Sequence, residues 1–287
     1  IAKRTGAKVH ILPIDPQTSL VDLSQLHTIL QEPIKLMAVS VESNVLGPIW
    51  GEKKELLYQL IAGVRQCGAK VVLDAAQVVA HEKVDVQALD CDFLAFSAHK
   101  MGGPTGLGVL YARESLHEDM APYRFGGGMV AAITQDYTTW QEAPQRFEAG
   151  TPPIAQVVGL GALLDFYRTQ VDLPQVAAHE AFLCEQLIAG LATIPGLHIV
   201  GNKKLLARCG HLVAWYMDDI HAHDLAESLS QYGCCVRAGD HCAQPIAALW
   251  DNKATVRASM FMYNTLDDVT ALVDAVKKSV EQWRKIL

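Results

Sequence analysis

Residues 70–100 read KVVLDAAQVVAHEKVDVQALDCDFLAFSAHK, and this stretch decides the fold. Two short apolar runs within it, residues 70–74 and 93–97, have the length and composition of buried strands, and polar residues follow each run. Helical and strand-like segments alternate on both sides of the stretch. This alternation predicts an α/β fold with a mainly parallel sheet.

The first half of the chain contains further elements of the same kind. In residues 52–67, apolar side chains recur at the spacing of one helix face, and Gly68 follows as a terminator. Residues 122–153 are rich in glycine, proline and aromatic side chains, which predicts a long loop region. The other elements predicted here are a strand at 8–14, a helix at 20–30 and strands at 35–42 and 108–112.

The pattern changes in the second half. The last helix begins at Thr265, and Asp268 stands at the third position of a capping box. Before it we predict, in order, a helix, a strand at 211–217, a helix at 224–232 and strands at 233–237 and 254–260. We therefore expect a large domain over residues 1–155, a connecting helix over 156–172 and a smaller α+β domain over 173–287.

The composition excludes several classes of protein. Of the 287 residues, 50% are hydrophobic and 19% are charged, which rules out a disordered chain. Lys and Arg number 24 against 31 Asp and Glu, a net charge of -7, so we expect no nucleic-acid partner. No apolar run approaches the roughly 20 residues that a membrane-spanning helix needs, so we expect no membrane partner either.

The seven cysteines do not form the pattern of a disulfide scaffold or a zinc site, because their number is odd and no C-x-x-C occurs. We expect reduced thiols and a cytoplasmic protein. His221 and His223 lie close together, but no third ligand stands at a telling spacing, so no metal site is predicted.

The first group of candidate site residues follows the two strands of residues 70–100. Ligands of such sheets bind beyond the carboxyl ends of the strands. Lys100 near the carboxylate of Asp74 suits a Schiff base with pyridoxal phosphate, because Asp74 would hold the pyridine nitrogen protonated. A carboxylate at the end of a buried strand needs a positive partner to stay ionised. Ser97 and His99 would face the phosphate, and the alternative is a surface lysine beside a locally satisfied aspartate.

The second group lies in residues 237–245, RAGDHCAQP. Cys242 stands beside His241 on a loop constrained by glycine and proline, and Arg237 is close in sequence. A thiolate in such a place can act as a nucleophile. The alternative is an inert buried cysteine, which we favour for each of the other six.

Arg257 stands within the apolar run of residues 254–260. A buried arginine needs an anion, and its planar fork suits a carboxylate. Arg257 is therefore a candidate for binding a substrate carboxylate. A structural salt bridge remains the alternative.

Five motifs together resemble the cysteine desulfurases of the aminotransferase class V family. The resemblance is greatest to the group with a short catalytic loop, which includes selenocysteine lyases and cysteine sulfinate desulfinases. The motifs are VLDAAQ at 72–77, FSAHKMGGPTG at 96–106, RFEAGTP at 146–152, RAGDHCAQP at 237–245 and VRASMFMYN at 256–264.

The resemblance implies a pyridoxal-phosphate transferase of fold type I, with helices on both faces of the sheet. Lys100 then matches the lysine that binds the cofactor and moves a proton, and Asp74 matches the partner of the pyridine nitrogen. Gln77 matches the residue beside the ring oxygen, and Asn44 matches another residue that contacts the ring. The resemblance also implies that the N-terminal part of the fold is missing from residues 1–287, including a phosphate-binding turn and a histidine that stacks on the cofactor.

Three residues match groups around the cofactor phosphate. Ser97 and His99 match its ligands, and we also place His99 among the catalytic residues. Thr151 is similar to a threonine that reaches the phosphate of the neighbouring subunit, which implies a homodimer.

The remaining matches concern the substrate. Cys242 matches the nucleophile that accepts sulfur from L-cysteine, Arg257 matches the residue that binds the carboxylate, and Arg237 lies near them. The family passes the sulfur to an acceptor protein for iron–sulfur cluster or cofactor assembly. Selenocysteine or cysteine sulfinate as substrate, another class V reaction, and an inactive piece with a structural or binding role remain the alternatives.

Overall fold

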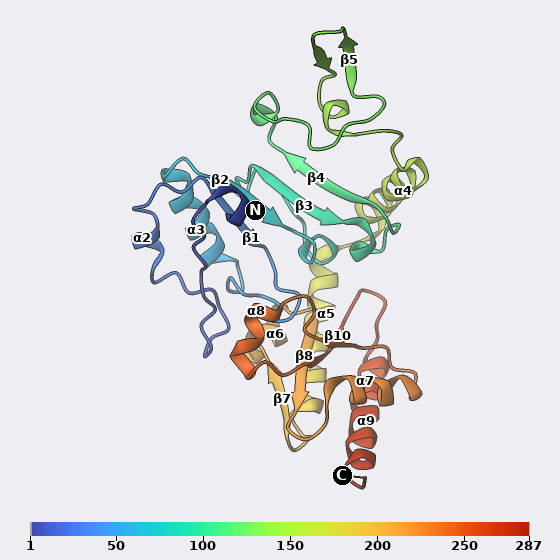
Figure 1. Ribbon diagram of the computed structural model, residues 1–287. Coiled ribbons are helices and arrows are strands. Elements are labelled where there is room, and N and C mark those ends of the chain that lie inside the picture. Colours follow the sequence, from blue (N-terminus) through green and yellow to red (C-terminus); the bar gives the residue numbers. More distant parts are fainter. Residues whose placement is uncertain (1, 287) are drawn as a thin grey trace.

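The structure is a computed structural model that describes residues 2–286 (Figure 1). Its larger sheet has the strand order β1-β2-β3-β4. The first three strands run parallel, so their carboxyl ends lie at one edge of the sheet, and β4 pairs antiparallel with β3. The strands are β1 (Leu36–Ser40), β2 (Lys70–Asp74), β3 (Phe93–Ser97) and β4 (Gly108–Ala112). The parallel α/β sheet predicted from residues 70–100 is therefore confirmed.

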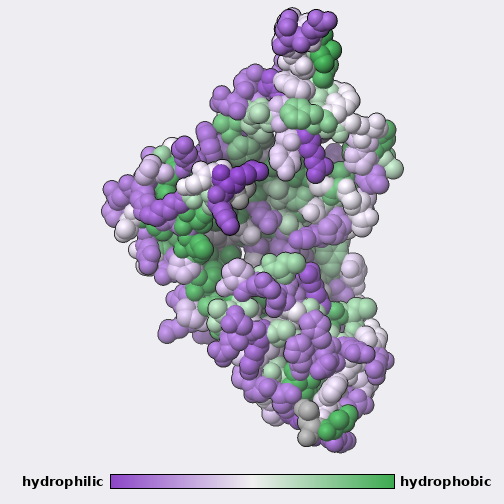
Figure 2. All heavy atoms as spheres, in the orientation of Figure 1, coloured by the Kyte–Doolittle hydropathy of each residue, from purple (hydrophilic) through white to green (hydrophobic). Residues whose placement is uncertain are grey.

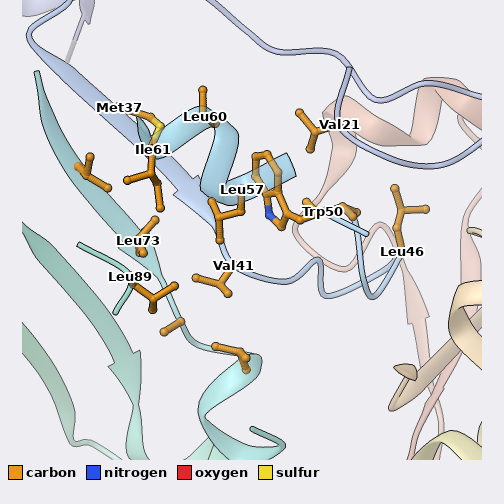
Figure 3. Close-up of a cluster of buried hydrophobic side chains, with 14 of the residues drawn as sticks. Val21, Met37, Val41, Leu46, Trp50, Leu57, Leu60, Ile61, Leu73 and Leu89 are labelled. Carbon is orange, nitrogen blue, oxygen red and sulfur yellow. The ribbon is translucent and has the colours of Figure 1, made fainter. Parts of the chain in front are cut away.

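Helix α3 (Glu55–Gln66) packs on this sheet through the apolar stripe seen in the sequence. Leu57, Leu60 and Ile61 are buried against Leu73 and neighbouring side chains (Figure 3). Gly68 follows with a left-handed φ of 73°, a conformation that a residue with a side chain would resist. The helix therefore ends where its terminating glycine was expected.

The strand predicted at residues 8–14 is wrong. Only Ile14 makes a β-bridge, to Val21, while Val9 is 63% exposed and Ile11 is 82% exposed. Strand β1 pairs with β2 alone among residues 2–286, so the apolar run has no ladder to join. The short helix α1 (Ala2–Thr5) precedes this run.

The helix predicted at residues 20–30 is much shorter, because only α2 (Leu26–Ile29) forms. The backbone N–H of Val21 donates to Ile49 O, and that of Asp22 donates to Pro13 O. These bonds to other segments replace the helical ladder over the first residues of the expected helix.

The glycine- and proline-rich segment forms a hairpin that the sequence pattern did not predict. Strands β5 (Val130–Ile133) and β6 (Thr138–Trp140) pair antiparallel and project away from the large sheet (Figure 1). The long helix α4 (Ile154–Gln170) follows, within two residues at each end of the connecting helix expected over 156–172.

The smaller sheet has the antiparallel order β7-β8-β10-β9. The capping box predicted at Thr265 is confirmed, since both of its hydrogen bonds with Asp268 are present. The strands are β7 (Leu197–Val200), β8 (Leu212–Met217), β9 (Arg237–Gly239) and β10 (Thr255–Ser259), and the helices are α5 (Leu173–Leu191), α6 (Lys203–Cys209), α7 (Ala222–Gln231), α8 (Gln244–Ala247) and α9 (Leu266–Trp283).

The strand predicted at residues 233–237 begins only at Arg237. The chain leaves α7 through Gly233, whose φ is 76°, and the N–H of Cys234 still donates to Leu229 O. Cys234 and Cys235 therefore lie in the connection and not in a strand.

The two sheets share a core, because Val200, Ala214, Ala247 and Trp250 pack with the side chains of the large sheet. The domain boundaries at residues 155 and 172 stay a prediction. Across residues 2–286, the helices are too short or too polar to span a membrane. Short 3₁₀ helices within the described residues complete the fold: η1 (Val78–Ala80), η2 (Ala98–Met101), η3 (Glu114–Leu116), η4 (Gln145–Phe147) and η5 (Ala248–Trp250).

Candidate active site

Asp74 is the last residue of β2, opposite Ala95 of β3, and its side chain is exposed. Its Oδ1 accepts a hydrogen bond from the N–H of Ala76 at 2.9 Å, and its Oδ2 accepts one from Ser40 Oγ at 3.5 Å. Within the described chain, no cation lies within 4.0 Å of the carboxylate, so the protein itself does not supply the positive partner that we expected. Its free face is available to a cationic ligand group.

Lys100 follows β3 in η2, which projects it outward. The buried residues Ala98 and Met101 anchor η2, while Lys100 and the adjacent His99 are exposed. The N–H of Gly103 donates to Ala98 O at 2.9 Å, and a Cβ at Gly103 would lie only 2.9 Å from that oxygen. The close turn therefore requires glycine and fixes the direction of Lys100.

Two other predicted residues lie near this edge. Ser97 ends β3 in extended conformation and is half-buried, and Gln77 is half-buried just before η1. Thr151, by contrast, is exposed between η4 and α4, where the structure shows no contact that joins it to Lys100 or Asp74.

The segment that follows β10 of the small sheet contacts η2. Phe261 and Met262 pack into the same apolar cluster as Ala98 and Met101. The residues of β10 are therefore held on the side of the molecule where Lys100 is presented.

Arg257 is the middle residue of β10 and stands opposite Arg237 of β9. Its Nη1 donates to Asn44 O at 2.9 Å, while its Nε is buried without a partner. No carboxylate of residues 2–286 lies within 4.0 Å of this guanidinium, so the alternative of a structural salt bridge does not hold there. Burial and the facing Arg237 lower the pKa of Arg257. Two like charges face each other here, which favours an anionic ligand between them.

Cys242 is exposed on the turn after β9, and Arg237 Nη2 lies 3.6 Å from its Sγ. The turn borders a pocket of about 400 Å³ that also includes Asp240, Gln244 and Pro245. His241 and Cys242 both have left-handed backbones, with φ values of 53° and 61°. The thiol is therefore open to reagents and stands beside a positive charge.

Asn44 contacts the Cys242 turn. Its Nδ2 donates to His241 O at 2.5 Å, and its own carbonyl accepts from Arg257. The expected contact between Asn44 and a cofactor ring stays a prediction, because the side-chain amide serves the turn in this structure.

Comparisons with known proteins identify the family of the chain. The sequence profile of the family described as Aminotransferase class-V matches residues 1–272. The chain belongs to the aminotransferase class-V family. It is 40% identical to proteins called cysteine desulfurase from Shigella flexneri and Escherichia coli (strain K12 / DH10B), over 97% of this chain and 66% of theirs. The chain thus spans slightly less than two thirds of these curated relatives.

Solved structures of similar proteins have the same fold. The cysteine desulfurase CsdA from Escherichia coli is 38% identical and superposes with a TM-score of 0.88, over 98% of this chain and 67% of that one. The apo cysteine desulfurase of Thermococcus onnurineus NA1 is 34% identical with a TM-score of 0.89, over 98% and 68%. The fold-type-I architecture expected from the resemblance is confirmed.

Sequence reasoning about this class-V protein missed a buried group of two histidine–glutamate pairs. Glu42 Oε1 lies 3.2 Å from His211 Nδ1, and His81 Nδ1 lies 2.8 Å from Glu180 Oε2. The two imidazole rings stack with their centroids 3.7 Å apart. The group joins the end of β1 and η1 to α5 and β8, and no local motif marks it.

The contact between Glu42 and His211 shifts the pKa of each group toward its charged form. Burial acts to raise the pKa of Glu42, but His211 lowers it overall. Burial acts to lower the pKa of His211, but Glu42 raises it overall. Each charge therefore stabilises the other in a place where either alone would be costly.

Proposed function

We propose that this class-V aminotransferase family member is a cysteine desulfurase that depends on pyridoxal phosphate. It converts L-cysteine to L-alanine and keeps the sulfur as a persulfide on Cys242. The observation that carries the proposal is the exposed Cys242 thiol, which stands 3.6 Å from Arg237, the residue opposite Arg257 in the small sheet. The names of the relatives at 38% and 40% identity support it.

The residues at the strand ends fit the cofactor. Lys100 offers an exposed amine, and Asp74 offers an exposed carboxylate with a free face at the same edge of the sheet. Ser97 and His99 would bind the phosphate, and Gln77 would lie beside the ring oxygen. When bound, pyridoxal phosphate would supply a sink for the electron pair left at the substrate Cα.

Each protein residue then has a defined task. Arg257 binds the substrate carboxylate through its guanidinium, whose Nε has no partner within the described residues. The amine of Lys100 removes the Cα proton and returns a proton to the carbon skeleton that becomes alanine. The Cys242 thiolate attacks the substrate sulfur, so that the carbon–sulfur bond breaks and a sulfur–sulfur bond forms. Cysteine and the enzyme thiol thus give alanine and the enzyme persulfide, with no external oxidant.

We further propose that the protein acts as a homodimer and passes its sulfur to an acceptor protein in the cytoplasm. The β5–β6 hairpin region exposes large apolar side chains, including Phe125, Ile133 and Tyr137 at 69%, 72% and 61%. Hydrophobic residues, drawn in green, reach the surface at the top of the molecule in Figure 2. Helix α4 exposes Ile154 and Val158 in the same way. Apolar groups gathered on one part of a surface favour burial by a second subunit. The seven free cysteines suit a reducing compartment.

The experiment compares Cys242→Ala with Cys235→Ala, which removes another exposed thiol. Each protein receives pyridoxal phosphate, L-cysteine and a thiol reductant, and alanine and sulfide are measured. We expect Cys242→Ala to form neither product. It should keep the absorbance of bound cofactor at about 420 nm. Cys235→Ala should match the wild type. Wild-type rates of alanine and sulfide formation by Cys242→Ala would show that the nucleophile is assigned wrongly.

The substrate is tested in the same assay. Cysteine, selenocysteine and cysteine sulfinate share the carboxylate and amine that Arg257 and the cofactor recognise. The Cys242 thiol is needed only to take sulfur from cysteine, so Cys242→Ala should lose cysteine turnover selectively. Equal loss with all three substrates would favour the alternative in which Cys242 supports binding.

A further inference from the structure

The turn that carries Cys242 is held in a conformation that side chains resist. His241 and Cys242 have consecutive positive φ values of 53° and 61°. A left-handed residue that is not glycine costs about 1–2 kcal/mol, and two in a row need surroundings that hold them. The turn therefore depends on specific contacts.

Within the turn, the N–H of Ala243 donates to Asp240 O at 2.8 Å. The buried contacts that tie the turn to other elements belong to His241. The side chain of His241 is only 2% exposed, whereas Cys242 beside it is exposed. His241 Nε2 lies 2.9 Å from Thr255 Oγ1 on β10, and Asn44 Nδ2 donates to the His241 carbonyl at 2.5 Å. One buried residue thus ties the turn to a strand of the small sheet and to the loop after β1.

The hydrogen-bond pattern favours one tautomer of His241. Thr255 Oγ1 lies 3.4 Å from Gly239 O, which can only accept, and 2.9 Å from His241 Nε2, so a hydroxyl that donates to Gly239 O accepts from Nε2. Nδ1 is buried and has no partner in residues 2–286. A proton on Nδ1 would be a buried donor without an acceptor, which is the costlier arrangement. The ring is therefore neutral and protonated on Nε2.

The charges around the ring act in the same direction. The groups that face it are Arg257 on β10, Arg237 on β9 and Asp240 in the turn. Burial, followed by the charges of Arg257 and Arg237, lowers the pKa of His241 to about 4. The ring therefore stays neutral throughout the ordinary pH range, and His241 Nε2 remains the donor to Thr255 Oγ1.

We propose that His241 is a positioning residue, which uses its neutral ring and its backbone carbonyl to hold the left-handed turn so that Cys242 stays beside Arg237. This role of His241 goes beyond the proposed reaction. It rests on the proposed function only for the assignment of Cys242 as the nucleophile. Without the link to Thr255, the turn relaxes and the sulfur leaves the positive charge.

The test measures the charge beside the sulfur, with neither cofactor nor substrate. Iodoacetate is an anion and iodoacetamide is neutral, so the ratio of their alkylation rates reports positive charge near a thiol. Peptide mass spectrometry gives this ratio for Cys242 and, in the same sample, for the exposed Cys67 as the reference. A result on this ratio stands whether or not the desulfurase assay succeeds.

The variants are His241→Phe, which removes the hydrogen bond, and His241→Gln, which places an amide donor near the position of Nε2. We expect the Cys242 ratio, divided by the Cys67 ratio, to fall about fivefold in His241→Phe, the size of one partly solvated charge interaction. His241→Gln should keep the wild-type value to within about twofold. Thermal unfolding followed by circular dichroism checks that each variant is folded.

Thr255→Val removes the acceptor without changing the side-chain shape, and it serves if His241→Phe does not fold. It should lower the ratio as His241→Phe does. A folded His241→Phe or Thr255→Val with the wild-type ratio would overturn the proposal. So would an equal loss in His241→Gln and His241→Phe, because the hydrogen bond would then not be the holding contact.

Discussion

Lys100 and Cys242 are both exposed, but different kinds of interaction place them. Backbone geometry places Lys100: β3 ends, η2 turns over buried Ala98 and Met101, and a close glycine contact completes the turn. Long-range side-chain contacts place Cys242, through Asn44, His241 and Thr255. Substitution of Lys100 should therefore change chemistry alone, whereas substitutions around Cys242 should also change geometry.

The largest expected effect is the loss of activity on substitution of Lys100. Lys100→Ala should lower kcat for alanine formation by roughly 10²–10⁴-fold, because the group that moves the proton is lost. Its thermal unfolding should not change, because the side chain is exposed and makes no hydrogen bond or ion pair within the described chain. Lys70→Ala, at an exposed position at the start of β2, is the matched control and should keep wild-type activity. A large loss of stability in Lys100→Ala would contradict the comparison.

The next effect concerns the buried pairs that hold the two regions together. Glu42→Gln should lower the free energy of unfolding by about 3 kcal/mol, because His211 loses its partner where water cannot replace it. Glu52→Gln breaks a surface pair with Arg208 and should cost less than about 1 kcal/mol. Urea denaturation of both variants measures the difference. Equal effects would show that the buried pair does not join the regions.

Arg257 gives a smaller effect, on binding. Arg257→Gln should raise KM for cysteine at least about tenfold, because the fork that binds the carboxylate is lost. Arg208→Gln, at a surface position, should leave KM unchanged. Initial rates over a range of cysteine concentrations separate KM from kcat. An unchanged KM in Arg257→Gln would place the carboxylate elsewhere.

The smallest effect is a pH dependence of the Glu42→Gln difference. The raised pKa of His211 means that its contribution is complete below its ordinary value of 6.5 and is lost as pH rises through the folded value. The lowered pKa of Glu42 means that its contribution is present above 4.5 and is lost as pH falls through the folded value. The stability difference should therefore be greatest between these values and shrink as the pH rises toward 8.

Urea midpoints of wild type and Glu42→Gln at several pH values provide the check. The other groups that act on the pair, His81, Glu180, Lys54 and Arg257, are the same in both proteins. A difference that does not vary with pH would mean that the pair is neutral.

The same contrast explains how far the sequence predicts the structure. Strands 70–74, 93–97 and 108–112 were predicted to the residue, because apolar runs with polar ends are local signals. The strand at 8–14 failed, since an apolar run also needs a partner strand. The link between Asn44 and His241 spans 197 residues, and no local pattern encodes it.

The candidate site divides in the same way. The strand-end residues Asp74 and Lys100 could be named from the sequence because parallel strands bring their ends to one edge. The buried pairs of Glu42 with His211 and of His81 with Glu180 could not, because they depend on how the two sheets pack together.

The central claim is that the Cys242 thiol accepts the substrate sulfur. The direct measurement is peptide mass spectrometry of the protein after it has been mixed with pyridoxal phosphate and L-cysteine, without a reductant. We expect one added sulfur atom on the peptide that contains Cys242 and none on the peptides that contain Cys67 or Cys235. Alanine formation with the added sulfur on another cysteine, or with none on the protein, would contradict it.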